Sequence, residues 1–303
     1  MSKRAVIFGG SGFLGSHVAD ALTAVEYEVR VFDIRPSPFI SSKQEMIVGD
    51  ILNESAVEEA VSGCDFVYNF AGIADIDEAS KRPLDSVKYN IVGNSIILEA
   101  CRKNSIKRFM FASSLYVYSK AGSFYRSTKQ SCELLIENYK EVFGLPYTIL
   151  RYGSLYGPRA DKKNFIHKIL TEALTKGKIT REGDGEELRE YIHVYDAAKG
   201  SIEILTDEFV NQYVIITGNQ QMKLKDLLSM IKEILDNKIE IKYTPPSFNY
   251  HYEITPYTFA PKIAKRLISK SYVDLGQGLI KCLQGIYKDL YPLPTYDGLV
   301  VKE

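Results

Sequence analysis

The chain has 303 residues, enough to bury a large core in one or two domains, and its 38 basic and 38 acidic side chains leave no formal net charge. This balance gives no electrostatic reason to expect nucleic acid or an anionic membrane surface as a partner. Its longest apolar runs are strand-sized, and the opening MSKRAVIFGG lacks an apolar region of signal-peptide length. We therefore expect a cytoplasmic protein.

Strand-length apolar runs alternate with helix-length amphipathic stretches through the first half of the chain, which is typical of a parallel sheet covered on both faces. Six strands are predicted, at Ala5 to Phe8, Val29 to Asp33, Met46 to Val48, Phe66 to Phe70, Phe109 to Ser113 and Thr148 to Arg151. The predicted helices between them are Phe13 to Ala24, Ala56 to Val61, Leu84 to Lys103 and Ser127 to Phe143.

After Arg151 this alternation becomes irregular. The predicted elements are a helix near residues 164–176, a turn at GDGEE, a strand and helix around 192–205, a strand in QYVIITG, and a helix at 224–235 before an irregular stretch at 243–261. We expect an α/β fold, with a doubly wound Rossmann sheet and a smaller C-terminal substrate-binding domain. The predicted NAD-binding domain covers 1–155, with a return near 188–218, and 156–303 is mostly substrate-binding.

The first predicted strand continues into GGSGFLGSH, where Gly9, Gly12 and Gly15 open the first predicted helix. Each has a task in a dinucleotide-binding turn: a tight bend, close approach of backbone to pyrophosphate, and close packing of helix on strand. The helix N-terminus then faces the phosphate charge. This segment predicts NAD contacts from Gly9, Gly12, Phe13, Leu14 and Gly15.

Two carboxylates follow the next strands. Asp33 ends the second strand, where a carboxylate accepts hydrogen bonds from both hydroxyls of the adenosine ribose. It would repel a 2′-phosphate, which favours NAD over NADP, while the nearby Arg35 weakens that discrimination. Asp50, next to Ile51, either meets the adenine amino group or caps the following helix. These four residues complete the predicted adenosine side of the site.

A candidate catalytic group combines Ser114, at the end of a strand, with Tyr125 and Lys129. Tyrosine and lysine four residues apart lie on one face of a helix, so the ammonium can approach the phenol. A phenol with a pKa of about 10 is a poor base at neutral pH unless a nearby cation stabilises its ionised form. Ser114 would hydrogen-bond the substrate hydroxyl while Tyr125 accepts its proton. In isolation the pair could equally be a surface pair; following an NAD fingerprint, it predicts catalysis.

Several segments together resemble one family. They are GGSGFLGSH, NFAG, YNIVGN, FASSLYVY, YRSTK, LRYGSLYGPR and GDGEELREYIHVYDAA. The chain resembles the extended short-chain dehydrogenase/reductases, the NAD-dependent nucleotide-sugar epimerase/dehydratase family, over nearly its whole length. The resemblance implies an enzyme with NAD as cofactor and a nucleotide sugar as substrate.

The resemblance also implies individual roles. Ala71 and Gly72 would line the nicotinamide side of the cofactor, Asn90 would support the active site through water and backbone, and Lys129 would hold the nicotinamide ribose. Arg189 matches the arginine that grips the substrate pyrophosphate, a bidentate task suited to a guanidinium. From the residues alone, a surface salt bridge of that arginine is the alternative.

Departures from the family pattern narrow the chemistry. Leu115 and Tyr116 stand where the 4,6-dehydratases carry their Asp-Glu pair, so dehydration is disfavoured, and no Cys/His pair for epimerisation at C3 and C5 falls near these motifs. Ser154 replaces the usual asparagine after the sixth strand, at a predicted substrate contact. The segment from Ser114 to Tyr125 is short and omits a loop that normally covers the sugar.

Two enzyme hypotheses and one non-enzyme hypothesis follow. The favoured one is a 4-dehydrogenase that gives a 4-keto sugar and recycles NADH with an oxidant such as a 2-keto acid, because an open site does not enclose an intermediate. The alternative is a 4-epimerase similar to UDP-glucose 4-epimerase. An NAD-sensing regulator would be expected to lose Tyr125 or Lys129, and both are present.

Partners and cysteines complete the expectations. The resemblance implies a homodimer through a four-helix bundle of the helices near 84–103 and 127–143. Apolar side chains there permit it, unless they face only their own sheet: Ile96, Ile97, Leu134 and Leu135. No metal site or disulfide framework is predicted, because the cysteines are scattered without CxxC spacing, and we expect buried free thiols at Cys64, Cys101, Cys132 and Cys282.

Overall fold

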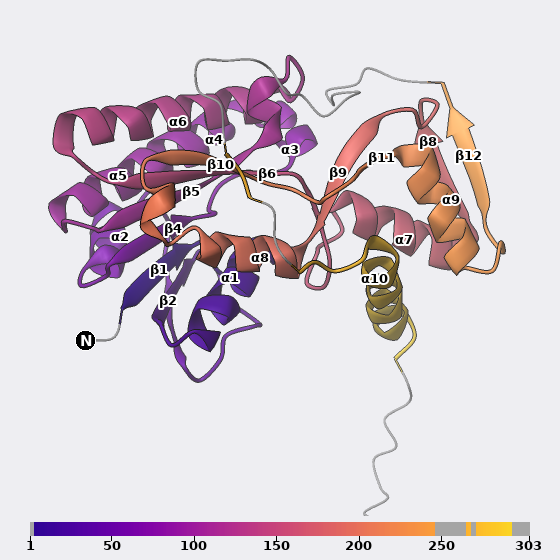
Figure 1. The fold of residues 1–303 in the computed structure, drawn as a ribbon, viewed down its shortest axis with the longest axis horizontal. Helices are drawn as coiled ribbons and strands as arrows, with labels where there is room; N and C mark the ends of the chain where they lie inside the picture. The colour runs from indigo at the N-terminus through magenta and orange to yellow at the C-terminus, as the bar shows by residue number, and fades with distance from the viewer. Residues whose placement is uncertain (1–2, 246–264, 268–270, 293–303) are drawn as a thin grey trace, which may run out of the picture.

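The computed structural model describes residues 3–245, 265–267 and 271–292. Its centre is an eight-stranded sheet in the order β13-β10-β6-β5-β4-β1-β2-β3, in which every pair of neighbours is parallel (Figure 1). The order β3-β2-β1-β4-β5-β6 is that of a Rossmann sheet, which confirms the predicted fold class. The strands are β1 (Arg4–Phe8), β2 (Glu28–Asp33), β3 (Gln44–Val48), β4 (Phe66–Asn69), β5 (Arg108–Ser114), β6 (Tyr147–Tyr152), β10 (Gln212–Ile216) and β13 (Lys265–Arg266).

Helices cover both faces of this sheet. On one face, α1 (Phe13–Ala24) and α8 (Val194–Glu203) enclose a core cluster; on the other, α2 (Glu54–Val61), α5 (Gly93–Lys103) and α6 (Ser123–Phe143) enclose a second (Figure 1). Every residue of β4 and β6 is buried. A parallel strand covered on both faces reads as a continuous apolar run, which is why the sequence predicts these strands well.

The segment from 76 to 103 differs from its prediction. Instead of one helix from Leu84 to Lys103, the chain forms α4 (Pro83–Ser86), a π-helical stretch η1 (Val87–Val92) and then α5. A short helix that was not predicted, α3 (Ile76–Lys81), precedes them. A single π turn barely changes the apolar pattern along a helix, so periodicity predicts the helix and not the change in its hydrogen bonding.

A second unit packs beside the sheet around a core cluster of its own. A three-stranded sheet in the order β11-β9-β7 and the parallel pair β12-β8 lie there with three helices, and the boundary predicted after residue 155 falls within β7. The sequence missed β8, β12 and α10, and the aromatic stretch 248–259 lies outside the described residues. The elements are β7 (Ser154–Tyr156), α7 (Phe165–Lys176), β8 (Lys178–Glu182), β9 (Leu188–His193), β11 (Gln221–Lys223), α9 (Leu224–Ile234), β12 (Glu240–Thr244) and α10 (Leu275–Leu290).

The cysteines follow their prediction. All four are buried free thiols, and burial raises the pKa of Cys64 and of Cys282 to about 11, which keeps both protonated at neutral pH. Within the described ranges, no helix combines the length and apolar character needed to cross a membrane.

Candidate active site

The turn between β1 and α1 requires its glycines. Gly9 has a φ of +75°, and a Cβ there would lie 2.7 Å from the backbone nitrogen of Ala71. A Cβ on Gly15 would lie 2.3 Å from the carbonyl oxygen of Gly9. Gly12 is exposed, and its added Cβ would meet nothing closer than 3.2 Å.

Gly12 is the N-cap of α1, and no side chain caps that end of the helix. An uncapped N-terminus beside an exposed glycine leaves backbone N–H groups facing outward, which fits a diphosphate. Phe13 and Leu14 follow in the first turn, with Leu14 buried in the core. The turn therefore has the form that a dinucleotide needs.

Asp33 lies beside this turn. Its Oδ2 accepts a hydrogen bond from the backbone N–H of Ser11 at 3.0 Å, and its Oδ1 accepts one from the backbone N–H of Arg35 at 3.4 Å. These bonds hold the carboxylate at the end of β2 next to the glycines, where the adenosine ribose is predicted.

Asp50 does not cap the following helix. The N-cap of α2 is Asn53, whose side chain accepts from the backbone N–H of Ala56. Asp50 instead accepts from the backbone N–H of Leu52 at 2.9 Å, within the turn. The capping alternative is therefore wrong, and the adenine contact of Asp50 stays a prediction, as does that of the buried Ile51 beside it.

We expect Asp33→Ala to weaken NAD binding about tenfold to a hundredfold, since hydrogen bonds to a charged group contribute roughly 1.5–3 kcal/mol. It should also narrow the difference between NAD and NADP, because the repulsion of a 2′-phosphate disappears. Calorimetric titration of both dinucleotides measures this. Asp33→Asn, which keeps an acceptor for Ser11, separates loss of charge from loss of the turn. Equal affinities of the wild type for the two dinucleotides would contradict the role of Asp33.

On the predicted nicotinamide side, the side chain of Asn90 holds the loop after β4 by hydrogen bonds. Gly72 has a φ of +130°, and a Cβ there would lie 2.4 Å from Oδ1 of Asn90. Asn90, in the π-helical stretch, accepts from the backbone N–H of Ile73 at 2.7 Å and donates to the carbonyl of Ile73 at 3.1 Å and to Oγ1 of Thr128 at 3.0 Å. The prediction that Asn90 supports the site through backbone agrees with this geometry, and Thr128 is a partner that the sequence did not suggest.

The three candidate catalytic residues come from β5 and α6. Ser114 is the last residue of β5 and is buried, with Oγ accepting from the backbone N–H of Tyr116 at 3.3 Å. Tyr125, in the first turn of α6, is 9% exposed and packs with Ile73 and Tyr116. The ring centroids of Tyr116 and Tyr125 lie 6.2 Å apart, edge to face. The short connection after β5 brings these two phenols together.

Lys129 lies below the Tyr125 ring. Its Nζ is 5.9 Å from the centroid of that ring and 4.7 Å from the ring centroid of Phe111, and it donates to the carbonyl of Ala112 at 2.7 Å. Burial lowers the pKa of Lys129, and the neighbouring Cys132 and Glu133 oppose that shift. The tyrosine and lysine thus form a buried pair, and the alternative of a surface helix pair is wrong.

Ser154 and Arg189 line one cleft of about 200 Å³. Arg189, 9% exposed, extends from β9 and donates to the carbonyl of Leu188 at 3.0 Å, so it is a buried group and not a surface one. The cleft also reaches Tyr116, which contacts Tyr125. The cleft therefore runs from Tyr116, next to the candidate catalytic tyrosine, to the cationic side chains of the second unit, and Ser114, Tyr125 and Lys129 do not themselves line it.

Further residues line this cleft that the sequence did not single out. Arg181 stacks over the ring of Phe165 at 5.1 Å, and its buried Nε has no hydrogen-bond partner. No local motif marks these positions, since they come from different elements of the second unit. The other lining residues are Asp75, Asp77, Leu155, Lys163, Ile166, Lys168, Glu187, Tyr191 and Leu224.

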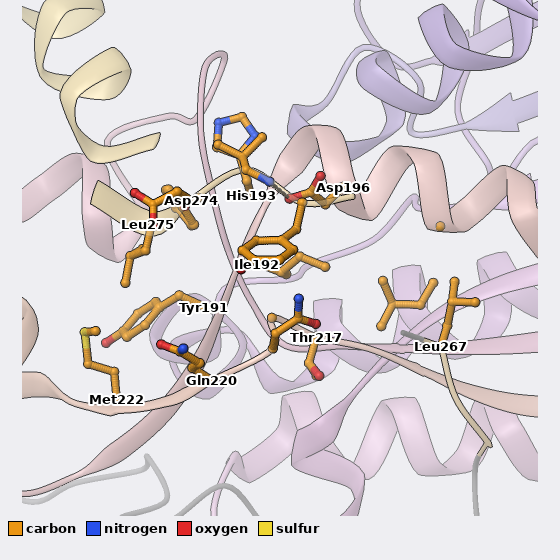
Figure 2. A pocket seen from close by; sticks show the side chains of 17 residues that line it. Tyr191, Ile192, His193, Asp196, Thr217, Gln220, Met222, Leu267, Asp274 and Leu275 are labelled. Atoms are coloured by element: carbon orange, nitrogen blue, oxygen red, sulfur yellow. Dashed lines mark hydrogen bonds between the residues drawn. The ribbon is translucent and has the colours of Figure 1, made fainter. Parts of the chain in front are cut away.

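A second cavity, of about 110 Å³, is lined by none of the predicted site residues. Figure 2 shows its lining from β9, the segment after β10 and the start of α10, with Tyr191 shared between this cavity and the cleft. Asp196 lines it and accepts from the backbone N–H of Val273 at 2.8 Å. Of the predicted site residues, the two substrate-binding candidates Ser154 and Arg189 line the cleft, and none lines this cavity.

Known proteins share this architecture. A UDP-N-acetyl-alpha-D-glucosaminuronate decarboxylase of Bacillus cytotoxicus is 29% identical over 276 residues, covering 81% of this chain and 84% of the relative. The UDP-glucose 4-epimerase of Thermotoga maritima, solved with UDP-glucose, superposes with a TM-score of 0.83 at 25% identity, covering 95% of this chain and 99% of that one.

A UDP-glucuronic acid 4-epimerase from Bacillus cereus, solved with UDP-glucuronic acid and NAD, superposes with a TM-score of 0.82 at 26% identity, covering 95% of this chain and all of that one. The family model of the NAD dependent epimerase/dehydratase family matches residues 5–215. The glycine turn and Asp33 fit its cofactor, NAD. The chain belongs to the NAD dependent epimerase/dehydratase family of enzymes.

Proposed function

We propose that the chain is a nucleotide-sugar 4-epimerase. The observation that carries this proposal is the single cleft that extends from Tyr116, beside Tyr125, to Arg189. A sugar at the first end and a diphosphate at the second would match the two ends chemically, because the guanidinium suits phosphate oxygens. Two of the solved structures with this fold are 4-epimerases of UDP-sugars, which supports the same choice.

In the proposed reaction, bound NAD supplies the hydride acceptor at C4. Ser114 hydrogen-bonds the substrate hydroxyl and orients it, and the phenolic oxygen of Tyr125 accepts its proton. The ammonium of Lys129 favours the ionised phenol. Once the 4-keto sugar has turned its other face, the hydride would return from the reduced cofactor to C4 on that face, and Tyr125 would return the proton to the C4 oxygen, which gives the inverted alcohol.

Other reactions of the family receive less support. A 4,6-dehydration needs an acid and a base beside the sugar, and Leu115 in this chain is a buried apolar residue. A 4-dehydrogenase is the second candidate, because the segment between Ser114 and Tyr125 is short and a site left open by it would not need to retain a keto intermediate. An NAD-sensing regulator has no need of a buried Tyr125–Lys129 pair.

The deciding experiment incubates the purified protein with UDP-glucose, UDP-glucuronic acid and their N-acetylated counterparts, with and without 2-ketoglutarate. We expect the 4-epimer to form with NAD in catalytic amounts and no dependence on the keto acid. Accumulation of a 4-keto sugar that requires 2-ketoglutarate would instead establish the dehydrogenase. NAD binding without turnover of any sugar would contradict both enzyme proposals and leave the regulator.

We also propose that two chains associate through α4, η1, α5 and α6. Of the apolar residues that the sequence suggested, Ile97 is fully buried and Ile96 and Leu135 pack against the core of their own chain, so they do not form this surface. Leu134 is 59% exposed. Other exposed apolar residues lie on the same helices: Leu84, Val87 and Val92.

We expect Leu134→Glu to convert a dimer into monomers, because a charge would be buried at the centre of the interface. Sedimentation velocity measures the change. Val142→Glu, which places the same charge on an exposed apolar position near the end of α6, is the matched control. A wild-type protein that sediments as a monomer would contradict the proposed association.

A further inference from the structure

The inward face of α6 continues beyond the candidate catalytic pair. Tyr125, Lys129 and Glu133 recur every four residues and therefore share one face of the helix. The Glu133 side chain is only 8% exposed. Its Oε1 accepts from Oγ of Ser113 at 2.6 Å and from Nε of Arg151 at 3.0 Å, and its Oε2 accepts from Nη2 of Arg151 at 2.6 Å. Glu133 is thus fully engaged in a buried, bidentate ion pair.

Arg151, on β6, extends the network to the other side of the catalytic serine. Its Nη1 donates to the hydroxyl of Tyr118, in the short helix η2 (Leu115–Tyr118) that follows β5. Its guanidinium also stacks on two aromatic rings, with its carbon 4.5 Å from the ring centroid of Tyr118 and 4.3 Å from that of Tyr213. One buried ion pair therefore joins β5, η2, α6 and β6.

The position of Ser114 follows from these contacts. Ser113 precedes it and Tyr118 follows it after one short turn, and both are hydrogen-bonded to the same ion pair. Glu133, one partner of that pair, lies on the helix that carries Tyr125 and Lys129. Any shift of α6 along β5 would strain these hydrogen bonds, so the network fixes the separation of the serine from the tyrosine.

The network also surrounds Lys129 with charge. The β5 side supplies the carbonyl of Ala112 and the ring of Phe111, neither of which titrates at neutral pH. Burial alone would disfavour the ammonium, and Glu133 counteracts it. The titratable groups that act on Lys129 are Tyr125, Cys132 and Glu133, all on α6, and Arg151 on β6 is joined to this group through its ion pair with Glu133.

We propose that Glu133 and Arg151 are positioning residues, which fix Ser114 relative to Tyr125 and keep Lys129 charged inside the protein. A buried ion pair is often no more stabilising than apolar residues of the same volume, so stability alone gives weak reason for it. The proposal rests on the proposed function for the roles of Ser114, Tyr125 and Lys129, and its central measurement does not require turnover.

The test compares the wild type with Glu133→Gln and with the double variant Glu133→Gln/Arg151→Gln. Lysine labelled with carbon-13 at Cε reports each ammonium by NMR as pH rises, and Lys129→Met assigns the Lys129 signal. We expect Glu133→Gln to lower the pKa of Lys129 by about one unit or more, because the carboxylate is lost and the Arg151 charge is left unpaired. The double variant removes both charges, so its Lys129 pKa should lie between those of the single variant and the wild type.

A Lys129 pKa of the double variant between those of the single variant and the wild type would show that charge causes the shift. General disruption of the structure would instead lower the Lys129 pKa of the double variant at least as far as that of the single variant. If Glu133→Gln does not fold, the double variant, which leaves no charge unpaired, is compared with the wild type alone and should still lower the Lys129 pKa. An unchanged Lys129 pKa, or a double variant below the single one, would overturn the charge role.

Positioning is tested by Ser113→Ala, which removes one hydrogen bond from the network and leaves both charges in place. We expect kcat for the UDP-sugar to fall several-fold with KM and the Lys129 pKa unchanged. An unchanged kcat would overturn the positioning role. If the wild type turns over no UDP-sugar, the proposed function fails, while the NMR titration still decides whether Glu133 and Arg151 control the charge of Lys129.

Discussion

Tyr125→Phe is expected to reduce kcat by a factor on the order of 10²–10⁴, the range that a positioned general acid–base group contributes. The substitution removes only the phenolic oxygen and keeps the ring, which is nine-tenths buried against Ile73 and Tyr116. The Lys129 ammonium retains its hydrogen bond to the carbonyl of Ala112. NAD affinity should therefore stay within about twofold of the wild type, a change of about 0.4 kcal/mol, because the ring and Lys129 keep their positions.

The measurement pairs steady-state turnover with NAD titration of the same preparation. Tyr139→Phe is the matched control, because it removes a phenol from the same helix, where the hydroxyl donates to Glu99 and not toward the cleft. We expect that control to retain its kcat. Turnover by Tyr125→Phe at the wild-type rate would exclude the phenol as the proton acceptor.

Gly15→Ala should have the largest effect on folding. Its Cβ would lie 2.3 Å from the carbonyl oxygen of Gly9 and 2.9 Å from the Cα of Gly10, and both neighbours are backbone atoms that have no rotamer to change. Overpacking of this kind costs about 1–3 kcal/mol and can cost more where the backbone must move. We expect a lower Tm and loss of NAD binding, measured by thermal denaturation and calorimetry.

Gly12→Ala is the contrasting variant in the same turn. Its φ of −79° is open to any residue, it is exposed, and its added Cβ meets nothing closer than 3.2 Å. That contact, with the carbonyl oxygen of Gly9, is tight but needs a shift of only a few tenths of an ångström, so we expect a smaller destabilisation than the roughly 1–3 kcal/mol of Gly15→Ala. NAD binding should weaken at least tenfold, because the methyl group would occupy the space that the pyrophosphate needs. Full NAD affinity in Gly12→Ala would show that the dinucleotide does not approach this turn.

The sequence predicted the first half of the fold because local pattern determines it. Helix α1 begins at Phe13 and ends at Ala24, as predicted, and the six strands through β6 overlap their predicted ranges. The strands β8 and β12 are each stabilised by a partner some 60 residues away, with Ile179 opposite Ile241. The segment of β8 shows no clear alternation by itself, whereas Ile239, Ile241 and Tyr243 alternate with polar residues, a signal for β12 that the sequence analysis did not use. Pairing at that distance leaves no mark in a local window.

Some residues of the candidate site were predicted from local sequence, and others were not. Gly9, Asp33, Tyr125 and Lys129 carry known spacings, so the sequence predicted them, and the structure brings Asp33 to the glycine turn and Lys129 beneath Tyr125. Arg181 belongs to no motif, and Thr128, although it stands within YRSTK, is identified as a partner of Asn90 only by its tertiary contact.

The sequence alone places Glu133 on the same helix face as Lys129, since it lies four residues beyond it on the predicted helix. Its partner Arg151, at the end of the sixth strand, could not be identified without knowing which strand lies next to that helix. A four-residue spacing identifies the face of a helix and not the side chain opposite it.

The π-helical stretch Val87–Val92 is equivalent to an α-helix into which one residue has been inserted. Each residue of a regular helix turns the next by about 100°, so deleting one amino acid there would tighten the spiral and rotate Asn90 away from Ile73 and Thr128. A chain with this deletion would thus gain a more regular helix, and the loop after β4 would lose its hydrogen bonds between Ile73 and Asn90. At this position, a regular α-helix and the contacts of Asn90 with Ile73 and Thr128 exclude each other.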